Sequence, residues 1–281
     1  MAQKVLDAIL SFRAPAAKRL EHKDVRGVCA ETHVLCVQEL LSHDAQRFFD
    51  RLGEGTFISR FRDHNWPSLW PAAFRGSGLG IASRSKLVNP NVYHYRSSGS
   101  GWDTLARKGT LHAQVHLEGG LIVDVVNTHL QAGDDRGAVQ VRKEQLRELT
   151  TLLRDIGAPD RPAIVCGDFN IDGLRAARSD GEYQTLSSAL LGFTDLGAQA
   201  DLATFEPHPE GNTLAHLHEP FGQKRRIDYV FFRAATEKYS TFRPTKVERL
   251  FDRPLAAIAS GLRWFASDHF GLSASFEYER A

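Results

Sequence analysis

Five separate segments of the sequence each place an acid, an amide or an imidazole beside a run of apolar residues. The clearest is VCGDFN, in which a strand-like run leads through Gly167 to Asp168 and Asn170. Residues at strand ends are held rigidly, and the loops above them can be shaped around a ligand. The remaining polar residues at such positions are Glu39, His129, Asp228, Asp268 and His269.

These groups together predict a site that combines a hard cation with proton transfer. Carboxylate and amide oxygens suit Mg²⁺, and imidazole exchanges protons near neutral pH. Asp168 and Asn170 lie two residues apart, so on an extended segment their side chains would point the same way. Asp168 could then hold metal or handle a proton, while the neutral Asn170 donates to a phosphate oxygen.

Each segment taken alone has an ordinary structural explanation. A carboxylate such as Glu39 at a strand end is commonly solvated, and a single histidine is commonly a surface or satisfied core residue. The GDFN stretch could be an Asx turn made by Asp168 or Asn170. Five segments that supply the same kind of group favour the functional interpretation. No GxSxG, P-loop or GxGxxG pattern supports a competing chemistry.

The composition is that of a globular protein with its own core. The 281 residues are 42% hydrophobic and 25% charged, and we expect one domain over residues 1–281. With 35 basic and 34 acidic residues, bulk charge does not favour a nucleic-acid partner, although a local patch could still bind one. Cys29, Cys36 and Cys166 lie in apolar runs and are expected to be buried, unpaired thiols.

Targeting signals are weak in this sequence. No apolar run reaches the roughly 18 residues that span a bilayer, so no transmembrane segment is expected. The N-terminal MAQKVLDAILSFRAP lacks a long apolar core and a small-residue cleavage site, and is not typical of a signal peptide. The default expectation is a cytoplasmic protein, and a secreted mature form would have the same features.

Strand and helix patterns predict the elements that position these groups. Strands are expected over residues 4–10, 34–40, 77–84, 110–117, 120–130, 162–170, 226–233 and 271–279, with a hairpin turn at Gly119-Gly120. Helices are expected over residues 16–31, 42–52, 138–156 and 182–191. Residues 192–223 show little regular signal and are expected to be functional or partly helical. Several strands are apolar throughout, which predicts central sheets with helices outside.

In this order, the stretches QE, NTHL, GDFN, RIDY and SDH resemble the endonuclease/exonuclease/phosphatase superfamily, whose members cleave phosphoesters with Mg²⁺. The resemblance spans roughly residues 34 to 277. It implies an α/β fold, a four-layer α/β sandwich in which two central mixed β-sheets are flanked by helices. It also implies a metal-dependent phosphoric diester hydrolase that uses Mg²⁺ or Mn²⁺.

Two further stretches, WDTLARKG (Trp102 to Gly109) and THLQA followed by RxxQL, resemble neutral and bacterial sphingomyelinases. They imply a phospholipase C-type enzyme that removes a phospholipid head group with metal-activated water and contacts a membrane surface transiently. Trp66, Trp70 and Phe74 suit such an interface, or else belong to the core. The alternatives are a nuclease or phosphatase of the same superfamily, or a catalytically weakened binding protein on this fold.

The resemblance also assigns roles to residues. Asp228 corresponds to the carboxylate that orients His269, which acts as general base or ligand of a second metal. His129 faces the phosphate or assists the leaving oxygen, and Lys108 contacts the phosphate or is simply solvated. The implied metal ligands are Glu39, Asp168, Asn170, Asp268 and His269.

One departure from the family pattern concerns the first strand. Members usually end that strand with an Asn that helps hold metal and phosphate, and KVLDAILSF contains none. Ala8 falls near its place, with Asp7 beside it. Either Asp7 substitutes as an oxygen ligand, or the register differs, or the site is weakened.

Overall fold

The computed structural model describes residues 3–13, 23–40, 43–52, 56–60, 78–97, 107–158, 160–174, 177–178, 181–235, 241–257 and 263–279. The aromatic residues expected at a lipid interface, Trp66, Trp70 and Phe74, lie outside these ranges, as does Trp102. The helices that the structure describes are each too short or too polar to traverse a bilayer.

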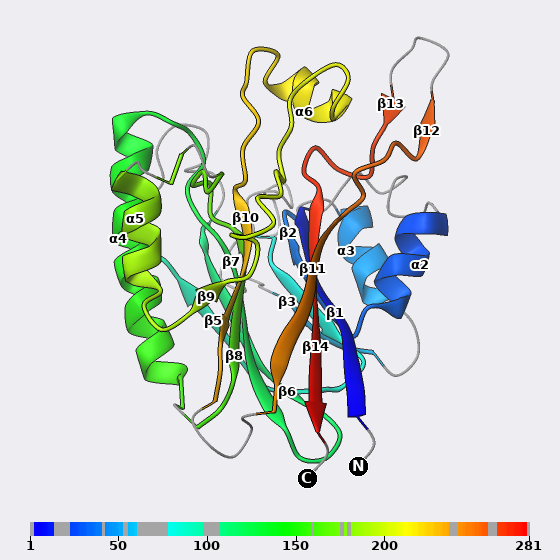
Figure 1. Cartoon of the computed structure of the whole chain (residues 1–281), viewed down its shortest axis with the longest axis vertical. Coiled ribbons are helices and arrows are strands. Elements are labelled where there is room, and N and C mark those ends of the chain that lie inside the picture. The colour runs from blue at the N-terminus through cyan, green and yellow to red at the C-terminus, as the bar shows by residue number, and fades with distance from the viewer. Residues whose placement is uncertain are drawn as a thin grey trace.

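Two six-stranded mixed sheets pack face to face at the centre of the described chain (Figure 1). The first has the order β11-β14-β1-β2-β4-β3, and its strands are β1 (Gln3–Arg13), β2 (Val34–Gln38), β3 (Phe57–Arg60), β4 (Gly80–Ser83), β11 (Arg243–Leu250) and β14 (Gly271–Glu279). The second has the order β5-β6-β7-β8-β10-β9, and its strands are β5 (Lys86–His94), β6 (Gly109–His116), β7 (Ile122–His129), β8 (Ala163–Asp168), β9 (Thr194–Asp195) and β10 (Asp228–Arg233). A short pair, β12 (Ala256–Ala257) and β13 (Arg263–Trp264), projects above them.

Helices cover the outer faces of both sheets and complete the four layers (Figure 1). On the first sheet lie α2 (Lys23–Glu31) and α3 (His43–Asp50), which bury Val25 and Phe49 against Leu35 and Val37. On the second lie α4 (Arg136–Ile156) and α5 (Gly181–Ala189). The apolar stripe of α4 packs on the outward side chains of β7 and β8, which include Val126 and Val165. The predicted four-layer α/β sandwich is therefore confirmed.

The main core lies between the two sheets, where inward side chains of both interdigitate. It joins Cys36 of β2 and Leu272 of β14 with Val125 of β7 and Cys166 of β8. Strands buried on both faces explain why these runs are apolar throughout. The three cysteines are buried and unpaired, as their apolar surroundings predicted.

The strands and helices that sequence patterning missed are short, polar or interrupted. β5 contains Pro90 and has a register shift between Val88 and Asn91, which is where a sheet tolerates proline. Half of the residues of β11 are charged and the strand is partly exposed, so no alternation marks it. Residues 192–223 contain β9 and the short helix α6 (Thr213–His218), so the expectation of a partly helical segment is confirmed.

The pairing of β1 with β2 corrects the expected place of Asp7 and Ala8. Both lie at a register shift before Ile9, which pairs with Val34 at the start of β2. The β1 residue level with Gln38, at the end of β2, is Arg13. Asp7 therefore lies six residues, or about 20 Å of strand, from that end. It cannot stand in for an oxygen ligand beside Glu39, and the position of the usual Asn falls at the end of β1.

Gly167 is required where β7 and β8 come together. Its φ is +138°, and a Cβ placed there would lie 1.9 Å from the carbonyl oxygen of Thr128. Only glycine permits this backbone approach, and the approach holds the end of β8 beside β7. The glycine in VCGDFN is thus a packing requirement that sets where Asp168 emerges.

Gly167→Ala should lower the free energy of unfolding by at least about 3 kcal/mol, because the new methyl group meets backbone atoms that cannot move aside. The matched control is Gly120→Ala. Gly120 also has a positive φ, of +81°, but a Cβ there would meet nothing within 4 Å. It should cost only about 1 kcal/mol. Urea unfolding followed by circular dichroism measures both, and equal losses would show that the contact with Thr128 does not constrain Gly167.

Candidate functional site

One row of paired residues crosses four strands of the second sheet at its upper edge. Gly109 of β6 pairs with His129 of β7, and His129 pairs with Asp168 of β8. Asp168 in turn pairs with Asp228, the first residue of β10. Three predicted site residues from distant parts of the sequence therefore lie side by side because their strands share one register. Lys108 precedes the row by one residue.

The GDFN turn after β8 is an Asx turn, and it corrects the expected geometry of Asn170. The backbone N–H of Asn170 donates to Asp168 Oδ1 over 2.9 Å, and Asn170 has a φ of +53°. The segment is therefore not extended, so the spacing of two residues does not by itself place the two side chains on one face. Asn170 Nδ2 donates to the carbonyl of Leu130, 3.1 Å away. Buried Phe169 makes edge-to-face contacts with Tyr229 and Phe231, whose rings stack on each other, and anchors the turn.

The RIDY stretch holds Asp228 in place through its neighbours. Arg226 is fully buried and binds the Asp195 carboxylate with both terminal nitrogens, at 2.8 and 2.7 Å. The Tyr229 hydroxyl donates to the carbonyl of Ile171 over 2.6 Å. Thr204 Oγ1 accepts the backbone N–H of Asp228 at 3.1 Å. The carboxylate is thus presented by a rigid strand end, and Thr204 is a supporting residue that no sequence signal indicated.

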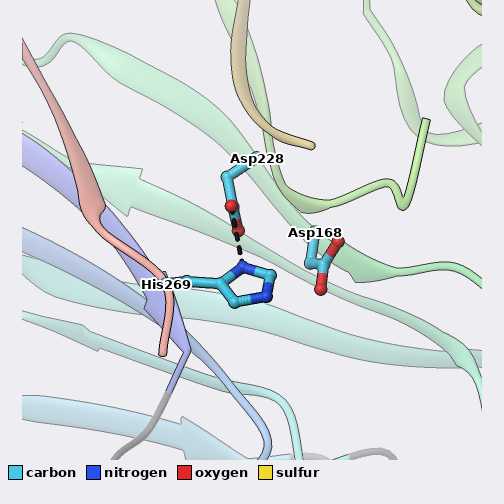
Figure 2. A group of neighbouring side chains, drawn as sticks. All are labelled: Asp168, Asp228 and His269. Atoms are coloured by element: carbon cyan, nitrogen blue, oxygen red, sulfur yellow. Dashed lines mark hydrogen bonds and ion pairs between the residues drawn. The ribbon is translucent and has the colours of Figure 1, made fainter. Parts of the chain in front are cut away.

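His269 reaches Asp228 from the other sheet. It lies two residues before β14, and its Nδ1 is 2.9 Å from Asp228 Oδ2 (Figure 2). Because a carboxylate can only accept, Nδ1 carries a proton, and Nε2 is an acceptor when the imidazole is in its neutral form. Figure 2 shows the imidazole between the two carboxylates, with Asp168 on the side away from the dashed bond. The edge of the His269 ring packs on Phe205, with the ring centroids 5.2 Å apart.

The surroundings of His269 make its protonated form unusually stable. Burial by itself lowers the pKa of this imidazole, but the charge and hydrogen bond of Asp228 and the charges of Asp168 and Asp268 outweigh it. The net effect raises the pKa from 6.5 to about 9. A raised pKa at a buried His–Asp pair is typical of a group that takes up a proton during a reaction.

Lys108 and His129 form a second polar pair beside Asp168. Lys108 Nζ is 2.9 Å from His129 Nε2, and that nitrogen is 3.5 Å from Asp168 Oδ2. Lys108 and Asp168 thus both approach the same nitrogen of His129, one as a donor and the other as an acceptor. Lys108 is 6% exposed, so it is not a solvated lysine. The pair places a positive charge at the row of carboxylates, where an anionic phosphate would need one.

Glu39 lies at the same upper edge, on the first sheet. Its neighbour Gln38 donates through Nε2 to Asn127 Oδ1 over 2.7 Å, and Asn127 donates to the backbone carbonyls of Val37 and Gly80. Asn127 comes two residues before His129 on β7. This buried amide pair joins the sheets below the site and gives a structural role to the Gln of the QE stretch and the Asn of the NTHL stretch. Sequence reasoning noted the stretches without finding this role.

Asp268 is turned toward α6. Its Oδ2 accepts from His218 Nδ1 at 3.0 Å, and its Oδ1 accepts from the Ser267 hydroxyl at 3.1 Å. The structure therefore brings together Lys108, His129, Asp168, Asn170, Asp228 and His269. Asp268 borders this group with both oxygens engaged, and its role as a metal ligand stays a prediction. His218, which the sequence analysis did not single out, bonds Asp268 at the border of this group.

The cluster fits a divalent cation. Asp168, Asp228 and His269 each offer a ligand atom, and these atoms lie within 4.8 Å of one another. Asp228 Oδ1 is buried and accepts no hydrogen bond from the described residues. A buried carboxylate oxygen is costly unless a cation or water meets it. Oxygen and imidazole donors without thiolate suit Mg²⁺ or Mn²⁺.

The loop that follows His129 is held by α4. Arg142 is buried and donates to the carbonyls of Gln131 and Gly133 at 2.9 and 2.6 Å. Gln145 Oε1 accepts the backbone N–H of Gln131 at 2.9 Å. These bonds give a physical reason for the spacing of THLQA and RxxQL: the arginine and glutamine of the helix fix the loop at the edge of the site.

A comparison with known protein families found a match over most of the chain. The sequence profile described as Endonuclease/Exonuclease/phosphatase family matches residues 5–269. Among curated protein sequences, none matches the chain at a significant level.

Solved structures of similar fold include bacterial and animal proteins. A beta toxin from Staphylococcus aureus has a TM-score of 0.75 and 17% identity, with 95% of this chain and 99% of that chain covered. Sphingomyelinase C from Streptomyces griseocarneus has a TM-score of 0.72 and 17% identity, with 96% and 98% covered. A humanized TDP2 of D. rerio has a TM-score of 0.66 and 20% identity, with 97% and 98% covered. At these identities the likeness concerns the fold.

The raised pKa of His269 predicts how stability depends on pH in metal-free protein. A folded pKa of about 9 against an ordinary 6.5 means that the pair stabilises the fold fully below pH 6.5. That stabilisation should be lost as pH rises through about 9. Unfolding free energies of wild type and Asp228→Asn, measured in chelator across this range, should converge as the pH rises. A constant difference would contradict the raised pKa.

Proposed function

The chain belongs to the Endonuclease/Exonuclease/phosphatase family, and on that premise we propose that it is a divalent-metal-dependent phosphodiesterase that cleaves choline-type phospholipids. The observation that supports catalysis most directly is the His269–Asp228 pair, with 2.9 Å between Nδ1 and Oδ2. In its neutral form, His269 would present Nε2 as an acceptor on the side away from Asp228, as a general base for water requires. Asp228 is held by strand pairing and would not move when the proton arrives.

In the proposed reaction, a water oxygen forms a bond to phosphorus while the phosphorus–oxygen bond of the leaving alcohol breaks. His269 Nε2 takes a proton of that water, and Asp228 stabilises the imidazolium and keeps its orientation. Lys108 offsets the growing negative charge on the phosphate oxygens. His129, which Lys108 contacts, lies where it can assist the leaving oxygen.

The metal in this proposal is Mg²⁺, with Mn²⁺ as an alternative. Asp168 is the nearest carboxylate to His269 that has no part in orienting it, and we assign it as a ligand. Glu39, at the matching edge of the first sheet, is the second ligand that we propose, and Asn170 and Asp268 are further candidates. When bound, the ion supplies Lewis-acid stabilisation of the phosphate and lowers the pKa of water.

Two observations favour a phospholipid over nucleic acid as the substrate class. The sphingomyelinase C structure has a higher TM-score than the TDP2 structure, 0.72 against 0.66. The net charge of +1 offers little bulk attraction to a polyanion. The THLQA–RxxQL arrangement that prompted the comparison has a structural basis in Arg142 and Gln145.

A nuclease or phosphatase of the same family is the second candidate. A similar structure is TDP2 of D. rerio complexed with a single strand DNA product, with a TM-score of 0.67 and 19% identity. Lys108 and a metal would bind a DNA phosphodiester by the same chemistry. A weakened binding protein is the third candidate, because Arg13 occupies the end of β1. The complete His269–Asp228 pair argues against it, since binding alone does not require that geometry.

A substrate panel separates these candidates. The protein is incubated with sphingomyelin vesicles, single-stranded DNA and a phosphomonoester, each with Mg²⁺ and with EDTA. We expect hydrolysis of sphingomyelin to exceed that of DNA, and chelator to abolish it, because the oxygen-rich cluster depends on a hard cation. Glu39→Gln should raise the Mg²⁺ concentration needed for half-maximal rate. Full turnover in EDTA would refute metal dependence, and faster cleavage of DNA would favour the nuclease.

The His–Asp pair is tested by a double-mutant cycle on kcat. Asp228→Asn should keep the fold and lower kcat roughly 10²- to 10⁴-fold, because the imidazole loses its orientation and its counter-charge. His269→Ala should be at least as damaging. The double variant should be little worse than the worse single variant, since residues that act as a unit are not additive. Losses that multiply independently would show that the two residues are not a catalytic pair.

A further inference from the structure

The segment around α6, residues 212–225, places two large apolar side chains in solvent. Leu217 is 59% exposed and Phe221 is 99% exposed. The other large hydrophobic residues that are exposed in the described part of the chain are Phe57 and Leu191. Two of these four residues therefore fall within five positions of one short segment, which departs from the isolated apolar residues that most surfaces show.

This segment lies at the end of the molecule that bears the candidate site. Figure 1 shows α6 above the upper edge of the sheets, next to β13 and opposite the chain termini. Asn212 caps α6 and donates through Nδ2 to the carbonyls of Ser267 and Asp268 at 2.8 and 3.1 Å. His218, at the end of α6, bonds the Asp268 carboxylate. The exposed apolar residues are thus fixed to the loop that carries His269.

We propose that the α6 segment docks the protein on a choline-phospholipid surface through Leu217 and Phe221. This inference rests on the proposed function and names the physical state of its substrate, a lipid aggregate rather than a dispersed molecule. Attachment through the segment would bring lipid head groups to the edge where His269, Asp168 and Lys108 lie. The same segment would have no part in hydrolysis of a small soluble phosphodiester.

The size of the apolar surface favours lipid over a protein partner. Two side chains of this kind expose at most roughly 200 Å² each, whereas a specific protein interface needs about 800 Å² per partner. A bilayer needs no complementary shape, and it accepts single aromatic and aliphatic side chains at the head-group boundary.

The charged residues around the apolar pair are engaged with one another. Lys224 has a side chain that is 53% exposed and forms an ion pair with Glu206 at 3.4 Å. Arg225 bonds the carboxylates of both Glu219 and Asp134. A choline-phospholipid surface is zwitterionic, so a patch of paired charges beside exposed apolar residues suits it better than it suits a polyanion. Helix α6 ends at His218, before Pro220, so Phe221 lies outside the helix.

The test uses the double variant Leu217→Ser with Phe221→Ser. Its matched control is Leu191→Ser, which also removes a solvent-exposed leucine (88% exposed), two residues after α5. Sedimentation with vesicles of phosphatidylcholine and sphingomyelin, in EDTA, measures docking without hydrolysis. We expect the double variant to bind vesicles at least tenfold more weakly than wild type, and the control to bind as wild type does. Phe221→Trp should retain binding.

A second measurement separates docking from catalysis. Hydrolysis of bis(p-nitrophenyl) phosphate, a soluble diester, should be unchanged in the double variant when Mg²⁺ is present. If neither protein hydrolyses any diester but the vesicle binding falls as expected, docking stands and the proposed function fails. Unaltered vesicle binding, or wild type that does not bind vesicles, overturns the docking proposal. Loss of single-stranded oligonucleotide binding with vesicle binding intact would assign the segment to nucleic acid and also overturn it.

Discussion

The site depends on one constraint, the common register of β6, β7, β8 and β10. Gly109, His129, Asp168 and Asp228 pair in sequence across the sheet, so groups from separate segments meet without any loop having to bring them together. The close backbone approach at Gly167 holds β8 beside β7 at this level. Because side chains alternate along a strand, a shift of one residue would turn the row to the opposite face and disperse it.

Polar contacts between the sheets convert that row into a site. The Gln38–Asn127 amide pair lies just below the upper edge, and the His269–Asp228 pair lies at the edge itself. Polar groups this deeply buried are costly unless they are bonded, so each pair favours one mutual position of the two sheets. The same contacts that align the sheets therefore align His269 with the carboxylates. Stability and chemistry share these residues.

Charge is concentrated at this edge in a form that an anionic ester and a cation can both use. Asp168 and Asp228 lie on either side of an imidazole whose pKa they raise, and Lys108 lies beyond His129. In the proposed reaction, a metal ion would offset the carboxylates, and Lys108 and the imidazole would face the phosphate. The α6 segment bonds Asp268 through His218 and lies above this edge of the sheets. Recognition and reaction would then share one end of the fold.

Sequence patterning predicted the buried strands, the amphipathic helices and central sheets with helices outside, because apolar periodicity is a local property. The resemblance carried by the ordered motifs added the four-layer class and the roles of the site residues. It left open whether Asp7 replaces the usual Asn and whether GDFN forms an Asx turn, and the structure places Asp7 away from the end of β1 and shows the Asx turn. Only the tertiary structure decided that Arg13 ends β1, that Lys108 is buried, that Asp268 turns to His218 and that Gln38 binds Asn127. These contacts depend on strand register and sheet packing, which bring together residues that are far apart in the chain. Neither residue of such a contact lies in a periodic sequence pattern that would reveal it.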